Sequence, residues 1–160
     1  MKTGLKIFFL AITAIALTTV PYTNCFAEEG YAGWEKDSTY NKLYNNKERD
    51  SLKGELLKFT KITPLQGMTP GTALILQEGD EKIIVHLCPW DYAAPEQTGL
   101  RKGVKTKLKG AWAVIDDKDI FMASKVKQGE DFEFKVRLTK DGTPFWTMSP
   151  EELALEQSKK

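Results

Sequence analysis

The chain is poor in the residues that most enzymes and metal centres use. Its 160 residues include one histidine, His86, and two cysteines, Cys25 and Cys88. No Cys-x-x-Cys-His, Gly-x-Ser-x-Gly or glycine-rich phosphate loop occurs in the sequence. Covalent haem is therefore excluded, and the commoner hydrolase and nucleotide-binding motifs are missing. We expect a protein that is not an enzyme and that needs no cofactor.

An excess of charge is also missing, because 23 basic residues stand against 22 acidic ones. A nearly neutral chain creates no overall field that would attract a polyanion, so nucleic acid is not an expected partner. The one long apolar run, Ile7 to Val20, is shorter than the roughly 20 residues of a membrane-spanning helix. We therefore expect no transmembrane segment once this run is removed.

The run belongs to a segment, Met1 to Ala27, that has the order of a secretory signal peptide. Two lysines precede the run, Pro21 ends it, and Cys25-Phe26-Ala27 is a small-x-small cleavage site. We expect a periplasmic or secreted protein. A retained anchor and a lipoprotein cut before Cys25 are the alternatives, although Tyr22 and Asn24 depart from the lipoprotein pattern.

Cleavage after Ala27 leaves residues 28–160, which suit one domain with one core. The two lysines of the signal leave with it, so this part carries a net charge of −1. Cys88 is then the single cysteine, and an internal disulfide is excluded.

From Ser51 onward the sequence alternates between apolar and polar residues in the manner of β-strands. A slip in phase near Leu56-Leu57 predicts a β-bulge. Lys140-Asp141-Gly142 predicts the turn of a β-hairpin, and Ser149-Pro150 predicts the start of a helix that reaches about Gln157. The expected strands are Leu52–Ile62, Thr72–Gln77, Glu81–Leu87, Lys105–Ile115, Ile120–Val126, Phe132–Leu138 and a short return over Thr143–Thr147.

Three strands, an interruption over Pro89 to Gly99 and two further strands are the order of a five-stranded OB-fold barrel. We therefore predict an all-β fold: this barrel, an added C-terminal β-hairpin over Asp131–Thr147 and a short C-terminal helix. A β-sandwich and an SH3-like barrel remain alternatives. The expected division is a signal peptide (1–27), an N-terminal lead segment (28–50), the OB-fold domain with its hairpin (51–147) and a C-terminal helix and tail (148–160).

Within the lead segment, we expect Glu28 to Trp34 to be flexible. Leu43 with Tyr40 or Tyr44 predicts one helical turn that packs on the domain. On the strand Lys105–Ile115, strict alternation predicts that Leu108, Gly110, Trp112 and Val114 share the apolar face, and that the lysines lie opposite with Ala111 and Ala113.

Short motifs between Tyr40 and Trp146 resemble those of a group of small bacterial periplasmic OB-fold proteins of unknown function. The motifs are Tyr40-Asn41-Lys42-Leu43-Tyr44, Gly54-Glu55-Leu56, Thr63-Pro64 with Gly67-Met68, Val85-His86-Leu87, Pro89 with Tyr92, and Gly142-Thr143-Pro144-Phe145-Trp146. The resemblance implies an exported, non-enzymatic binding or accessory role.

Binding residues are expected in the loop Thr63–Gly71 and in the segment His86–Tyr92. The candidates are Met68, His86, Trp90 and Tyr92, and the expected partner is another envelope protein or a small ligand. Trp112 and Trp146 are expected to pack in the core and against the added hairpin.

A soft metal such as Cu(I) is the alternative ligand, held by His86, Cys88 and Met68, because residues i and i+2 of a strand point to the same side. The opposing interpretation is a hydrogen-bonded histidine beside a buried cysteine.

The densest basic stretch places Lys105, Lys107 and Lys109 along one face of a strand. This stripe is either an anion-binding surface or the solvated side of a barrel strand, where lysine discourages pairing between strand edges. The solvated strand face is the favoured interpretation, because the expected compartment contains little nucleic acid and the nearly neutral chain has no overall field to attract an anion.

Mass spectrometry of the exported protein is expected to find a mature chain that begins at Glu28. A diacylglycerol adduct on Cys25 would instead show that the chain is a lipoprotein.

Overall fold

The computed structural model describes residues 31–159, and the predicted signal peptide lies outside this range. The described residues form a β-structure with four short 3-10 helices and one α-helix. The strands are β1 Arg49–Ile62, β2 Gly71–Glu78, β3 Glu81–Pro89, β4 Lys105–Ile115, β5 Lys118–Gln128 and β6 Phe132–Lys135. The 3-10 helices are Asn41–Leu43, Asn46–Glu48, Pro95–Gln97 and Phe145–Thr147, and the α-helix α1 is Pro150–Ser158.

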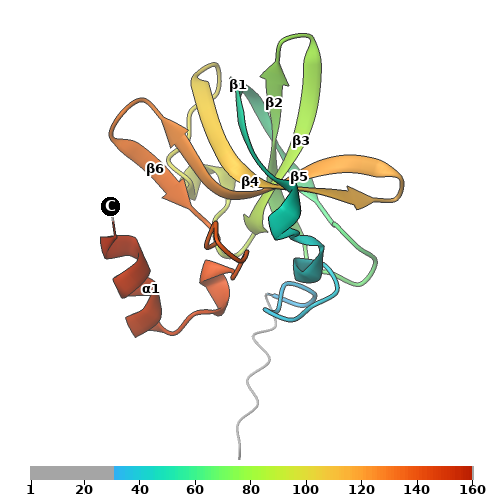
Figure 1. The fold of residues 1–160 in the computed structure, drawn as a ribbon, viewed down its shortest axis with the longest axis vertical. Coiled ribbons are helices and arrows are strands. Elements are labelled where there is room, and N and C mark those ends of the chain that lie inside the picture. Colours follow the sequence, from blue (N-terminus) through green and yellow to red (C-terminus); the bar gives the residue numbers. More distant parts are fainter. Residues whose placement is uncertain (1–30, 160) are drawn as a thin grey trace, which may run out of the picture.

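The strands form one sheet in the order β3-β2-β1-β4-β5-β6, and a pairing of β3 with β5 closes it (Figure 1). The neighbours in this order are antiparallel. The closing pairing is parallel and joins only Val85 to Phe121 and His86 to Met122. The prediction of an all-β, barrel-like fold with a short C-terminal helix is confirmed, and the strand order is compatible with an OB-fold.

Irregularities in strand register bend the sheet into the barrel. The predicted bulge is present, since the register of β1 against β2 shifts between Leu56 and Lys58. A second shift lies between Lys109 and Gly110 of β4, opposite Ser124 of β5.

The shift at Gly110 makes the prediction of strict alternation along β4 wrong. Beyond Gly110, Ala111 and Ala113 are buried, whereas Val114 is 58% exposed and Trp112 is half-buried. The face of β4 that is covered therefore changes where its pairing with β5 changes, which a period-2 pattern cannot reveal.

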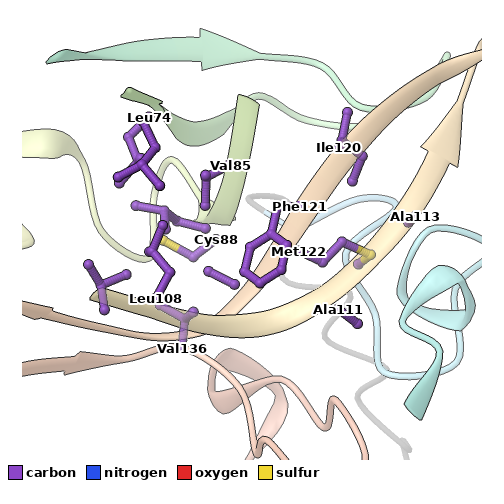
Figure 2. Packing of buried hydrophobic residues seen from close by; sticks show 14 of the residues in the cluster. Leu74, Val85, Cys88, Leu108, Ala111, Ala113, Ile120, Phe121, Met122 and Val136 are labelled. Carbon is purple, nitrogen blue, oxygen red and sulfur yellow. The ribbon is translucent and has the colours of Figure 1, made fainter. Parts of the chain in front are cut away.

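Aliphatic side chains and the Phe121 ring pack together inside the barrel (Figure 2), and the same buried cluster extends to Trp34, Tyr40, Tyr44 and Trp146. Cys88 lies among them as an apolar side chain and is fully buried. Large, fully buried residues include Leu56, Leu74, Leu76, Leu87, Leu108, Met122, Val85 and Val126.

The segment before β1 packs on the barrel. The predicted helical turn is present at Asn41–Leu43, and Tyr40 and Tyr44 on either side of it are buried. The expectation that Trp34 belongs to a flexible lead is wrong, because Trp34 is fully buried and its indole nitrogen donates to the Thr69 carbonyl oxygen at 2.9 Å. A tryptophan in a polar stretch gave no periodicity by which to assign it to the core.

The added hairpin is present in reduced form. β6 pairs with β5, but the predicted return strand contributes a single bridge between Arg137 and Pro144. Two hydrogen bonds flank this bridge, from Leu138 N–H to the Thr143 oxygen at 2.9 Å and from Phe145 N–H to the Val136 oxygen at 3.0 Å, after which the chain turns into the 3-10 helix Phe145–Thr147.

Helix α1 begins as predicted, with Ser149 and Glu152 forming a capping box. It lies beside the barrel near β6 and buries none of its residues (Figure 1). Within residues 31–159, no helix has the length and apolar character needed to cross a membrane.

Replacing Gly110 tests the packing of β4 on β5. A Cβ atom at this position would overlap the Met122 carbonyl oxygen and the Phe121 ring. We expect Gly110→Ala to lower the free energy of unfolding in urea by about 1–3 kcal/mol. The control is Gly79→Asn in the turn between β2 and β3, where the space is open and φ is +58°. Asparagine adopts this conformation readily, so an equal loss in both variants would contradict the packing argument.

Candidate functional site

His86 and Cys88, the predicted metal ligands of β3, are both buried. The His86 Nδ1 atom lies 3.1 Å from the Tyr40 hydroxyl oxygen, and the Cys88 thiol donates to the Ala93 carbonyl oxygen at 3.7 Å. The register of β3 against β2 shifts between these two residues, so that Leu87 has no partner in the ladder. The strict alternation along β3 that predicted His86 and Cys88 on the same side of the strand is therefore interrupted between them.

The other predicted binding residues do not join His86 in one open site. Met68 is buried and packs against Gly33. Tyr92 packs on Trp146, with ring centroids 5.8 Å apart. Trp90 is half-buried, and the Lys61 ammonium lies 4.5 Å from its ring centroid.

Arg137, which the sequence analysis did not single out, lies at the centre of a buried polar cluster. It is only 2% exposed. Its Nη1 atom donates to the carbonyl oxygens of Leu87 at 2.7 Å and Ala123 at 3.2 Å, and its Nη2 atom donates to Asn41 Oδ1 at 3.3 Å. Its Nε atom is the one buried side-chain nitrogen or oxygen without a partner among the described residues.

Aromatic rings complete the surroundings of this guanidinium. The Arg137 Cζ atom lies 4.7 Å from the Trp146 ring centroid and 5.8 Å from that of Tyr40, which are cation–π distances. The Trp146 indole nitrogen donates to the Trp34 carbonyl oxygen at 2.8 Å, as does the Asn41 side-chain amide. The cluster thus joins the segment before β1 to the segment after β6.

Burial keeps the neighbours of Arg137 uncharged. It raises the pKa of Tyr40 and of Cys88 to about 12. Burial and the positive charge of Arg137 together lower the pKa of His86 to about 4. At neutral pH, Arg137 is therefore the charged member of this group.

This electrostatic arrangement speaks against a metal cation at His86 and Cys88. A bound cation would be repelled by Arg137, and the thiol would have to lose a proton that burial holds firmly. In the part of the chain that the structure describes, no three His, Cys, Asp or Glu side chains form a metal-binding group.

The predicted stripe of Lys105, Lys107 and Lys109 is part of a larger surface, which we call the lysine face. Lys107 pairs with Lys53 of β1 on one side and with Lys127 of β5 on the other. Lys109 pairs with Lys125, which pairs in turn with Lys135 of β6. The lysine face comprises Lys53, Lys105, Lys107, Lys109, Lys125, Lys127 and Lys135.

Two glutamates on the same face offset part of this charge. Glu133 lies 3.2 Å from Lys125, 3.9 Å from Lys127 and 3.5 Å from Lys135. Glu55 pairs with Lys105 across β1 and β4. Partial burial alone would raise the pKa of Glu133, but Lys125 and Lys135 hold it below its usual value.

The charge that remains is large. Seven lysines and two glutamates give the lysine face a net charge of +5. Because residues 28–160 carry −1 in total, those outside the face carry −6. Among residues 31–159, the ammonium groups of Lys53, Lys105, Lys107 and Lys109 have no carboxylate oxygen within 4.0 Å.

The sequence shows the β4 stripe by itself, but the strand register is needed to see that lysines from β1, β5 and β6 extend it. The sequence signal that could have indicated the whole face is the alternation of lysines with apolar residues on all four strands.

Residues 48–133 match the model of the MamS/MamX magnetosome protein family. The matched segment contains β1 to β5 and all of the lysine face except Lys135, and it covers more than half of the chain. A search of the curated proteins finds no match to this chain.

The pKa of His86 predicts how stability depends on pH. The unfolded chain protonates this imidazole near its ordinary value of 6.5, whereas the folded chain does so only near pH 4. Between these values only the unfolded state gains the proton, so the free energy of unfolding falls as the pH falls. The loss from this group is about 3 kcal/mol in total, and it is complete below the folded-state pKa.

The measurement compares denaturant unfolding of the wild type and His86→Gln from about pH 7 to pH 4. Their difference in free energy of unfolding isolates His86 from the carboxyl groups that also titrate. A difference that does not change with pH would show that the imidazole is solvated.

Proposed function

Because the chain belongs to the MamS/MamX magnetosome protein family, we propose that it is an exported accessory protein of the magnetosome or the surrounding cell envelope. It binds a negatively charged partner through the lysine face and catalyses no reaction. The signal-like segment Met1–Ala27 and the resemblance to small periplasmic OB-fold proteins support export. The family name supports the magnetosome as the setting.

The observation that carries this proposal is the pairing of like charges across neighbouring strands. Lys53 with Lys107, Lys107 with Lys127 and Lys109 with Lys125 are direct cross-strand pairs. Side chains in such pairs have Cβ atoms about 5 Å apart, and like charges there destabilise a sheet. A barrel strand that needed only solubility would mix the two signs, so the repulsion is better explained by a partner that relieves it.

The end of the barrel offers less support for a binding site. The loop between β1 and β2, which includes Met68, borders an open hollow of about 530 Å³ together with Gly33, Glu35 and Tyr40. Glu35 is the one charged residue among those that line this hollow. His86, Cys88 and Tyr92 are taken up by internal contacts. The metal-handling alternative at His86, Cys88 and Met68 has no observation in its favour, and the charge of Arg137 opposes it.

The test measures the binding of poly-L-glutamate by isothermal titration calorimetry at low and at high salt. We expect Lys107→Gln with Lys109→Gln to weaken binding about thirtyfold at low salt, because each lysine near an anionic partner contributes on the order of 1 kcal/mol. We also expect the free energy of unfolding to stay equal or to rise by up to about 1 kcal/mol, since repulsion is removed.

The matched control is Lys47→Gln with Lys82→Gln, which removes two exposed lysines from outside the lysine face. Net charge falls equally in the two variants. If both lose binding to the same extent, or if wild-type binding is insensitive to salt, the lysine face is not the binding surface.

A further inference from the structure

The lysine face contains a hollow of about 300 Å³ at its centre. Five of the seven lysines line it, together with Ser51, Leu52 and Leu108, and no acidic residue does. The five are Lys53, Lys107, Lys109, Lys125 and Lys127.

We propose that this hollow is a binding site for a compact oligophosphate, a chain of two or more linked phosphate groups. The proposal rests on the proposed function, in which the lysine face binds an anion, and it names the chemical class of that anion. The aliphatic stems of lysines from β1, β4 and β5 form much of the lining, and their ammonium groups would fold inward over the bound anion; Ser51, which also lines the hollow, has a hydroxyl that can donate a hydrogen bond.

The size of the hollow favours a compact ligand. A volume of 300 Å³ lies at the lower end of the range for small-molecule sites. Neighbouring strands are about 4.8 Å apart, and same-face residues along a strand are about 6.8 Å apart. Flexible lysine stems on such a grid can bring several ammonium groups to one small polyanion.

The charge distribution also favours a compact ligand over a long one. The lysine face has a net charge of +5, while the remainder of residues 28–160 has −6. The part of a long acidic polymer that lies on the face would bind there, but the part that extended beyond the face would meet this negative surface and add no affinity. An oligophosphate places several negative charges within the hollow and none outside it.

The side chains around the hollow are compatible with phosphate and disfavour nucleic acid. All five cations are lysines, which bind phosphate as point charges. An oligophosphate has at least one negative charge on every linked phosphate group and is therefore a denser anion than a chain of carboxylates. No aromatic residue lines the hollow, so the stacking platform that binds single-stranded bases is missing there.

The positive charge of the hollow is only partly neutralised by a neighbouring acidic residue, Glu133. Glu133 neutralises part of the edge formed by Lys125 and Lys127. Lys53, Lys107 and Lys109 on the other side have no such partner among the described residues. Glu78 approaches this side only to accept a hydrogen bond from the Lys53 backbone N–H at 3.0 Å.

The experiment titrates the mature protein with sodium tripolyphosphate and compares two double variants by calorimetry. Lys53→Gln with Lys107→Gln removes two lysines that line the hollow. Lys105→Gln with Lys135→Gln removes two lysines of the same face that do not line it. We expect one tripolyphosphate per protein, a loss of affinity of about tenfold or more in the first variant, and a loss below about threefold in the second.

Citrate and poly-L-glutamate serve as competing anions. Citrate that binds as tightly as tripolyphosphate would overturn the preference for phosphate. Equal losses in the two variants would overturn the hollow as the site. If poly-L-glutamate binds and tripolyphosphate does not, this inference fails while the proposed function stands, and if neither binds, both fail.

A further arm uses farnesyl pyrophosphate, which carries two linked phosphates on a lipid chain. Tighter binding of tripolyphosphate would identify a free oligophosphate as the ligand, and tighter binding of farnesyl pyrophosphate would identify a lipid-borne one. Either result, if abolished in Lys53→Gln with Lys107→Gln, supports the site.

Discussion

Arg137 brings a positive charge into the interior where four segments of the chain meet, and no carboxylate accompanies it in the contacts described. Burial of an unpaired charge is costly. Here the cost is offset by carbonyl oxygens of Leu87 and Ala123, the Asn41 side chain and the faces of Tyr40 and Trp146. These contacts involve β3, β5, the segment before β1 and the segment after β6. The guanidinium therefore connects the last two segments to the barrel, and its positive charge opposes a cation at His86 and Cys88.

The buried cluster and the lysine face have separate roles in the molecule. The cluster is satisfied from within, apart from one nitrogen atom, and its aromatic and thiol groups are occupied by internal contacts. The lysine face lies on the outside of the same sheet and keeps like charges side by side on β1, β4 and β5. The region that matches the MamS/MamX family contains most of that face but not Arg137. The interior thus accounts for the fold, and the exterior is the better candidate for recognition.

Much of the fold could be predicted because alternation, turn residues and capping residues act locally. The bulge near Leu56 and the capping box at Ser149 are examples. What the sequence could not supply depends on register: the change of covered face at Gly110, the bulge between His86 and Cys88, and the lysines that flank the β4 stripe. Arg137 and Trp34 were missed for another reason. A charged residue on an alternating strand and a tryptophan in a polar segment are buried only because distant segments of the chain cover them.

The seam between β3 and β5 has a consequence for how the barrel opens. It consists of two residue pairs, whereas the antiparallel neighbours share much longer ladders. Transient opening of this seam would separate β3 from β5 without unravelling any hairpin, and would admit water to the imidazole that Tyr40 now shields. The backbone amides along this seam would accordingly be the first in the barrel to lose their protection from hydrogen–deuterium exchange. The barrel can therefore open between β3 and β5 while the lysine face, whose β5 members Lys125 and Lys127 lie beyond these pairs, keeps its structure.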